Sequence, residues 1–238
     1  MGLKVGMNLK PRYILTIGLA SLLYLMQAAV PVHADSFTMD LTGVGDGAVA
    51  NGVYVSPYQG TITDNITHNQ IFNGFVICDD FNTESYLNTP WNAISTNAGS
   101  LNGNEKFQTS LTSYTVQQNY NAVAWLANQL LLSGNVTNWT AQTNYSFAIW
   151  DIMDGQTTDP DGGAQALIAS AFDAVTNHGY VGSNVTVYTP NPNVNASQEF
   201  LVVNTPEPST LLLLGAGLLC LGLAAWRKQS PQPKELVL

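Results

Sequence analysis

The chain has 238 residues, and two terminal segments with patterns of their own leave about 170 residues for a folded body, the usual size of one domain. Between Asp35 and Thr205 the sequence contains one basic side chain, Lys106, and 14 acidic ones, so this segment carries a formal charge of −13. That balance excludes DNA and RNA as partners, because nucleic-acid affinity comes from Lys and Arg side chains that neutralise phosphates, and a hydrophobic content of 45% excludes a disordered chain.

Residues 1–34 have the order of a secretory signal peptide, with basic residues first, then an apolar stretch over 13–30, then a small residue. We predict cleavage between Ala34 and Asp35, so that the mature chain starts at Asp35. An uncleaved membrane anchor is the alternative. The helix-breaking Pro31 and the small Ala34 favour cleavage.

The body begins with patterns typical of β-strands. β-branched and aromatic residues bounded by Gly, Asn and Pro predict strands over 36–44, 52–62 and 71–81. The same signals return at 184–188 and 198–203.

The middle of the body changes to helical periodicity. We predict that a helix starts after Thr115, which forms a capping-box pattern with Gln118, and ends at Gly134. Two further helices are predicted over 140–153 and 164–177. The predicted fold class is therefore α+β, a single exported domain of strands with an inserted block of about three helices.

Beyond the body, the C-terminal segment has three parts. The motif Pro206-Glu207-Pro208 comes first, an apolar run over 211–225 follows, and the basic residues Arg227 and Lys228 end it. A helix of about 15 to 18 residues is about 22 to 27 Å long, which is just enough to cross the hydrocarbon core of a membrane. The positive-inside rule keeps this cytoplasmic basic stop inside, so the body lies outside.

This order resembles the PEP-CTERM sorting signal of Gram-negative bacteria. The resemblance implies recognition by exosortase, a membrane enzyme that cuts near the motif and releases the protein or transfers it to the cell exterior. Pro206, Glu207 and Pro208 would be read by that enzyme and would have no catalytic role in this chain. A plain single-span anchor is the alternative.

The sequence therefore divides into five segments. They are a signal peptide over 1–34, an α+β extracellular domain over 35–189, an extended stalk rich in Pro and Asn over 190–205, a sorting tail with a transmembrane helix over 206–229, and a short cytoplasmic tail over 230–238. The expected location is a membrane-anchored precursor that later reaches the cell surface or the exterior. The expected partners are the secretion machinery, exosortase and the membrane.

Cys78 is the one cysteine of the exported segment, because Cys220 lies in the apolar run of the tail. The sequence around Cys78, together with Tyr-Ser-Phe-Ala-Ile-Trp at 145–150, resembles bacterial thioester-forming adhesin domains over residues 71–155. In that family a glutamine two residues before Ala-Ile-Trp acylates the cysteine with loss of ammonia, and the product reacts with amines.

Ser146 stands at the position of that glutamine and has no carboxamide. Cys78 and Ser146 are therefore expected to mark a vestigial thioester site. Gln142, one helical turn earlier, is an alternative acyl donor. The simpler interpretation of Cys78 is a small buried hydrophobic residue on a strand.

Two acidic stretches complete the candidate residues. Asp79 and Asp80 are expected to be solvated charges at a strand end or hydrogen-bond partners of the helical block. Four aspartates with intervening glycines offer oxygen ligands for Ca²⁺, at Asp151, Asp154, Asp159 and Asp161. Their spacing is not that of an EF-hand loop, which favours a solvated turn, so no metal site and no cofactor are predicted.

No catalytic motif appears in the body. His68 and His178 are isolated, and the patterns HExxH, CxxC, G-x-S-x-G and the phosphate loop do not occur. We therefore expect a non-enzymatic protein of the cell surface or of an extracellular polysaccharide or biofilm matrix. The alternative is an adhesin-like domain that binds a surface ligand without a functional thioester. A secreted hydrolase would need a His base paired with a nucleophile.

Overall fold

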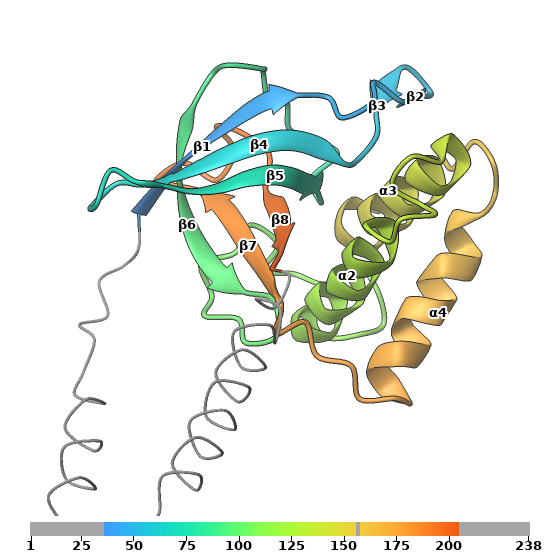
Figure 1. Cartoon of the computed structure of the whole chain (residues 1–238). Coiled ribbons are helices and arrows are strands. Elements are labelled where there is room, and N and C mark those ends of the chain that lie inside the picture. The colour runs from blue at the N-terminus through green and yellow to red at the C-terminus, as the bar shows by residue number, and fades with distance from the viewer. Residues whose placement is uncertain (1–35, 156–157, 205–238) are drawn as a thin grey trace, which may run out of the picture. The chain divides into compact units, whose positions relative to one another are not determined.

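The computed structural model describes residues 36–155 and 158–204, which hold eight strands and three helices (Figure 1). The strands are β1 (Ser36–Gly43), β2 (Val49–Ala50), β3 (Val53–Tyr54), β4 (Tyr58–Asp64), β5 (Gln70–Cys78), β6 (Trp91–Asn97), β7 (Val185–Pro190) and β8 (Phe200–Val203). The helices are α2 (Val116–Leu130), α3 (Trp139–Asp154) and α4 (Ala164–Thr176).

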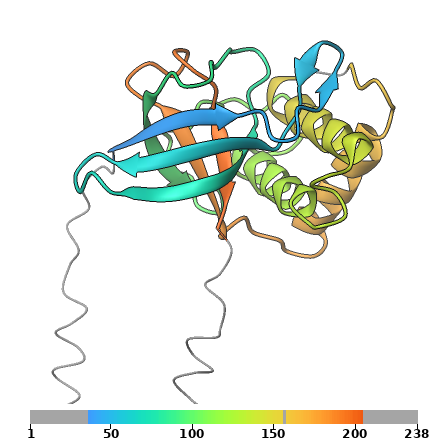
Figure 2. The ribbon, with the colours of Figure 1, turned by 45° about the horizontal axis from the view of Figure 1, so that its top comes forward.

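Six strands close into an antiparallel barrel in the order β1-β4-β5-β8-β7-β6, and β6 pairs back with β1. Strands β2 and β3 form a separate two-stranded sheet. Each of the six strands therefore has a neighbour on both sides, although β5 pairs with β8 only at Ile77 and Cys78. The helices α2, α3 and α4 lie together beside the barrel in both views (Figures 1 and 2).

Alternate residues of β5 and β8 face two different hydrophobic cores. Cys78 and Phe200 belong to the core inside the barrel. Ile77 and Leu201 belong to the core that the barrel shares with the helices. These strand ends are buried on both faces, which explains why their sequences are continuous apolar runs and do not alternate with polar residues.

The helical block was predicted correctly in outline. The Thr115 side chain accepts from the backbone N–H of Gln118 and the Gln118 side chain accepts from the N–H of Thr115, so the predicted capping box is confirmed. Asn138 caps α3 through its side chain, and Gly155 ends that helix in the left-handed conformation at φ 69°. Helix α2 ends at Leu130, earlier than the predicted stop at Gly134, because a series of turns begins at Leu131.

The strand predictions need three corrections. The segment 52–62 is divided between β3 and β4, since Pro57 has no N–H to donate to a ladder. Strand β6 was missed, because its Asn, Ser and Thr residues resemble a loop. The expected stalk over 190–205 is wrong, because it contains β8, whose residues Phe200 to Val202 are buried between β5 and β7.

The predictions for the two ends of the chain are not tested by the described residues. The predicted signal peptide and the predicted transmembrane helix of the tail lie outside the described residues. Within the ranges 36–155 and 158–204, no helix combines the length and the apolar character needed to span a membrane.

Candidate functional site

Cys78 ends β5 inside the barrel and is fully buried with a free thiol. Its Sγ donates a hydrogen bond to the backbone oxygen of Asp80 over 3.2 Å. Burial raises the pKa of the Cys78 thiol well above its usual value, and the nearby carboxyl groups of Asp80 and Asp79 raise it further. The thiol therefore stays protonated at neutral pH, which agrees with a small buried hydrophobic residue and not with a nucleophile.

Ser146 on α3 lies close to Cys78 and is connected to it through a third residue. The Ser146 Oγ accepts a hydrogen bond from the backbone N–H of Ser56 over 2.9 Å, and the Ser56 Oγ accepts one from the N–H of Cys78 over 3.1 Å. Trp150, one turn further along α3, donates its indole N–H to the Cys78 carbonyl over 3.1 Å. The fold thus brings Cys78 and Ser146 together, but the Ser146 hydroxyl accepts a hydrogen bond from the backbone of Ser56.

Gln142 does not replace the missing acyl donor. Its side-chain Nε2 donates to the Asp46 carboxylate over 3.0 Å and to the Val136 carbonyl over 2.7 Å. The carboxamide is therefore engaged at the N-terminal end of α3, away from Cys78.

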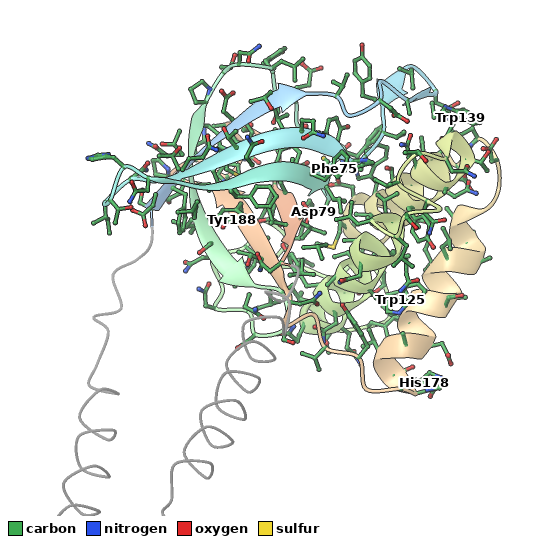
Figure 3. The ribbon with its side chains drawn as sticks, in the orientation of Figure 1. Phe75, Asp79, Trp125, Trp139, His178 and Tyr188 are labelled. Carbon is green, nitrogen blue, oxygen red and sulfur yellow. The ribbon has the colours of Figure 1, made fainter. Side chains whose placement is uncertain are left out.

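Asp79 follows β5 and lies between the barrel and the helices (Figure 3). Asp79 and Glu199 are both fully buried, which contradicts the expectation that Asp79 is solvated. No donor reaches either side-chain oxygen of Asp79, and the group that faces it is the carboxylate of Glu199. Burial, together with the negative charge of Glu199, raises the pKa of Asp79 well above its usual value, which favours the protonated form of Asp79.

The Glu199 carboxylate accepts several hydrogen bonds. It receives hydrogen bonds from the Tyr120 hydroxyl over 2.6 Å, from the backbone N–H of Lys106 over 2.8 Å and from the Thr189 hydroxyl. Burial raises the pKa of Glu199, and these donors act against the rise. The network links β8, β7, α2 and the segment before α2 at one buried point.

Lys106 and Asp80 form a second buried contact beside the first. The Nζ of Lys106 contacts the Asp80 carboxylate and the Thr83 hydroxyl. The Lys106 side chain is 11% exposed and that of Asp80 0%. Of the two alternatives expected for Asp80, the solvated charge is therefore wrong, since the buried Asp80 carboxylate contacts the one Lys or Arg side chain of the described residues.

Three of the four aspartates that were considered as Ca²⁺ ligands, in a stretch expected to be a solvated turn, serve as hydrogen-bond acceptors. Asp159 accepts from the backbone N–H groups of Asp161 and Ala164, and Asp151 accepts from Gln165. Asp154 accepts from the backbone of Phe81 and from the Asn82 side chain. No group of three or more His, Cys, Asp or Glu side chains suited to a metal ion occurs in the part of the chain that the structure describes.

A groove with a volume of about 660 Å³ opens beside the segment that follows Asp80. It is lined by Leu41, Val44, Gly52, Val53, Tyr54, Tyr58, Phe81, Thr83, Glu84, Ser85, Tyr86, Leu87, Trp150 and Gln198. Two aromatic rings are available to solvent there, since Tyr54 is 49% and Tyr86 64% exposed. The Tyr86 hydroxyl donates to Glu84 over 2.6 Å, and Gln198 donates to the Asp80 carbonyl over 2.8 Å, so polar groups alternate with the rings.

Residues 204–229 match the family model of the PEP-CTERM protein-sorting motif. The chain carries a PEP-CTERM sorting motif. A PEP-CTERM motif implies an exported protein that is processed by exosortase. The match spans the Pro206-Glu207-Pro208 motif as well as Arg227 and Lys228, and the roles of these individual residues stay predictions, since they lie outside the described residues.

Other comparisons add little to the match with the sorting motif. No curated protein matches the chain. Among solved structures, the N-terminal domain of the Streptococcus pyogenes pilus tip adhesin Cpa is similar, with a TM-score of 0.39 and 12% identity over 75% of this chain and 100% of that domain. A similarity of this size does not establish a function.

Sequence reasoning missed Ser56, Glu199 and the groove. The sequence contained only indirect indications of a buried acidic site. Glu199 directly precedes the apolar residues of β8, a position where a charged residue requires a partner. Lys106 stood out as the single cation of the body, and any buried carboxylate in need of a counter-charge had to use it.

Proposed function

We propose that this PEP-CTERM protein is a non-enzymatic component of the cell surface or extracellular matrix, and that the groove lined by Tyr54 and Tyr86 binds a polysaccharide without acidic groups. The observation that carries the proposal is the pair of exposed rings, Tyr54 and Tyr86, in a groove of about 660 Å³ with polar neighbours. Aromatic faces contribute a large contact area at low entropic cost, and adjacent polar side chains give hydrogen bonds with direction.

The charge of the body narrows the ligand class. The segment from Asp35 to Thr205 has a formal charge of −13, and Glu84 lies in the groove itself. A polymer of uronic acids or sulfated sugars would be repelled over a Debye length of about 8 Å at physiological salt. Neutral sugars or amino sugars meet no such repulsion.

A binding screen on the purified exported protein tests this proposal. We expect neutral or amino-sugar oligosaccharides to bind and acidic ones not to bind. In Tyr86→Ala and Tyr54→Ala the affinity should fall at least about fivefold, since truncation of an aromatic anchor costs ~1 kcal/mol or more. Phe75→Ala is the matched control, because Phe75 is an exposed ring on β5 outside the groove lining (Figure 3).

The outcomes separate the alternatives. Equal loss of affinity in the Phe75 control, or binding of acidic polymers alone, contradicts the proposed site. Binding of a protein and of no glycan favours the adhesin-like alternative. Shortening of the bound glycan during incubation contradicts a non-enzymatic role.

A further inference from the structure

Lys106 occupies an unusual place for a lysine. It is the only Lys or Arg side chain within 36–155 and 158–204, and it is buried to all but 11% of its side-chain surface. Lysines are seldom buried unless they are paired. Its Nζ contacts the fully buried carboxylate of Asp80 and the hydroxyl of Thr83.

Protein encloses this contact almost completely. A buried ammonium and carboxylate lose their hydration, and the loss can exceed their mutual attraction. Transfer of one proton from Lys106 to Asp80 gives an amine and a carboxylic acid without any change in net charge. Asp79 and Asp154 hold carboxyl groups nearby whose pKa values are raised by burial, so the cluster retains protons.

An amine in contact with a protonated carboxyl group is a pair that can condense. We propose that Lys106 and Asp80 become joined by an intramolecular amide bond between Nζ and Cγ. The nitrogen lone pair of the neutral amine forms the new C–N bond, the C–OH bond of the carboxylic acid breaks, and the hydroxyl leaves with a proton from nitrogen as one water molecule. The ammonium and carboxylate thus become an amide and water, and no other reactant is needed.

The bond would connect parts of the chain that no disulfide can connect. Asp80 directly follows β5, and Lys106 lies in the segment between β6 and α2. Cys78 is the only cysteine of the described residues and is a free thiol. The amide would lie next to the buried Asp79 and Glu199. Asp80 directly follows Asp79 in the chain, and the backbone N–H of Lys106 donates to Glu199. This inference is independent of the proposed ligand.

Two measurements on the exported wild-type protein test the bond. The intact mass under denaturing conditions should be lower than the mass of the mature sequence by one water molecule. Lys106 is also the only site for trypsin between Asp35 and Thr205, and a lysine whose Nζ is acylated is not cleaved. The denatured wild-type body should therefore stay uncut, whereas Lys106→Arg should have its full mass and be cut into two fragments.

Each contrary result overturns the proposal. A wild-type protein with its full mass has no such bond. A mass lower by one water in a body that trypsin still cuts at Lys106 indicates another dehydration, such as a cyclic imide. A mass deficit that persists in Lys106→Arg excludes the lysine as the donor, and one that persists in Asp80→Ala assigns the bond to a different carboxyl group. The wild-type result decides the question even if a variant fails to fold.

Discussion

The side-chain Oγ of Ser146 accepts a hydrogen bond from the backbone N–H of Ser56 over 2.9 Å, and both residues are fully buried. In Ser146→Ala this N–H has no partner, and an unsatisfied buried donor costs about 1 to 3 kcal/mol. We expect the free energy of unfolding to fall by that amount in denaturant titrations. Ser170→Ala, at an exposed position of α4, is the matched control and should change stability little. Equal losses in the two variants would contradict a specific role for Ser146.

The Cys78 thiol should be unreactive in the native protein. Burial raises the pKa of the thiol, and only the thiolate is a good nucleophile. We expect no labelling by iodoacetamide at pH 8 and no adduct after incubation with methylamine. Denatured protein, the control, should be labelled at one site between Asp35 and Thr205. A methylamine adduct on any glutamine of the native protein would restore the covalent adhesin interpretation.

The buried pair of Asp79 and Glu199 should make stability decrease as pH rises. The pKa of Asp79 is raised in the folded state, so the folded protein binds more protons than the unfolded chain above the ordinary Asp pKa of about 4. The free energy of unfolding should therefore be highest at or below about pH 4 as far as this group is concerned, and it should fall until the folded-state pKa has been passed. A difference of one pKa unit corresponds to about 1.4 kcal/mol.

The variant Asp79→Asn isolates this contribution. An amide stays uncharged at every pH, so the variant should be more stable than wild type at pH 8 and should show a shallower decline from pH 5 to 8. Glu199 and Asp154 also have raised pKa values and leave a residual slope of the same sign. Unfolding curves at four or more pH values test this, and a wild-type stability that increases from pH 5 to 8 would refute it.

Replacement of Glu207 should block processing and leave membrane insertion unchanged. Glu207→Ala removes the single charged group of the Pro206-Glu207-Pro208 motif but keeps the apolar run and the basic stop. The full-length precursor should accumulate in the membrane fraction of a host that has its own exosortase, as immunoblots of membrane and medium would reveal. Ser209→Ala, just after the motif, is a suitable control. Normal processing of Glu207→Ala would mean that the tail is only an anchor.

The helices were predictable because their signals are local. The Thr115 and Gln118 capping box and the periodic apolar positions are read within one short window. The closure of the barrel was not predictable, because it depends on pairing between strands such as β5 and β8 that lie far apart in the sequence. The same reason explains why the sequence left two alternatives open for Asp79 and Asp80, since the residues that bury them come from α2, α3 and β8.

The candidate site was predicted in part. In the structure Ser56 connects Cys78 and Ser146 through hydrogen bonds, whereas the interpretation of the two positions as a vestigial thioester site stays a prediction. Ser56 carried no motif of its own, and the groove is assembled from five separate stretches of chain, so neither could be found by spacing.

The position of β8 in the barrel has a consequence for biogenesis. This strand ends at Val203, one residue before the segment that matches the sorting motif, and it is the strand that fills the space between β5 and β7. An exported chain therefore cannot complete its barrel during translocation until almost the whole body has crossed, and until then β5 and β7 expose unpaired edges. A chain that stalls a few residues short would present those edges to neighbouring chains. The segment that matches the sorting motif therefore begins directly after the strand that closes the barrel.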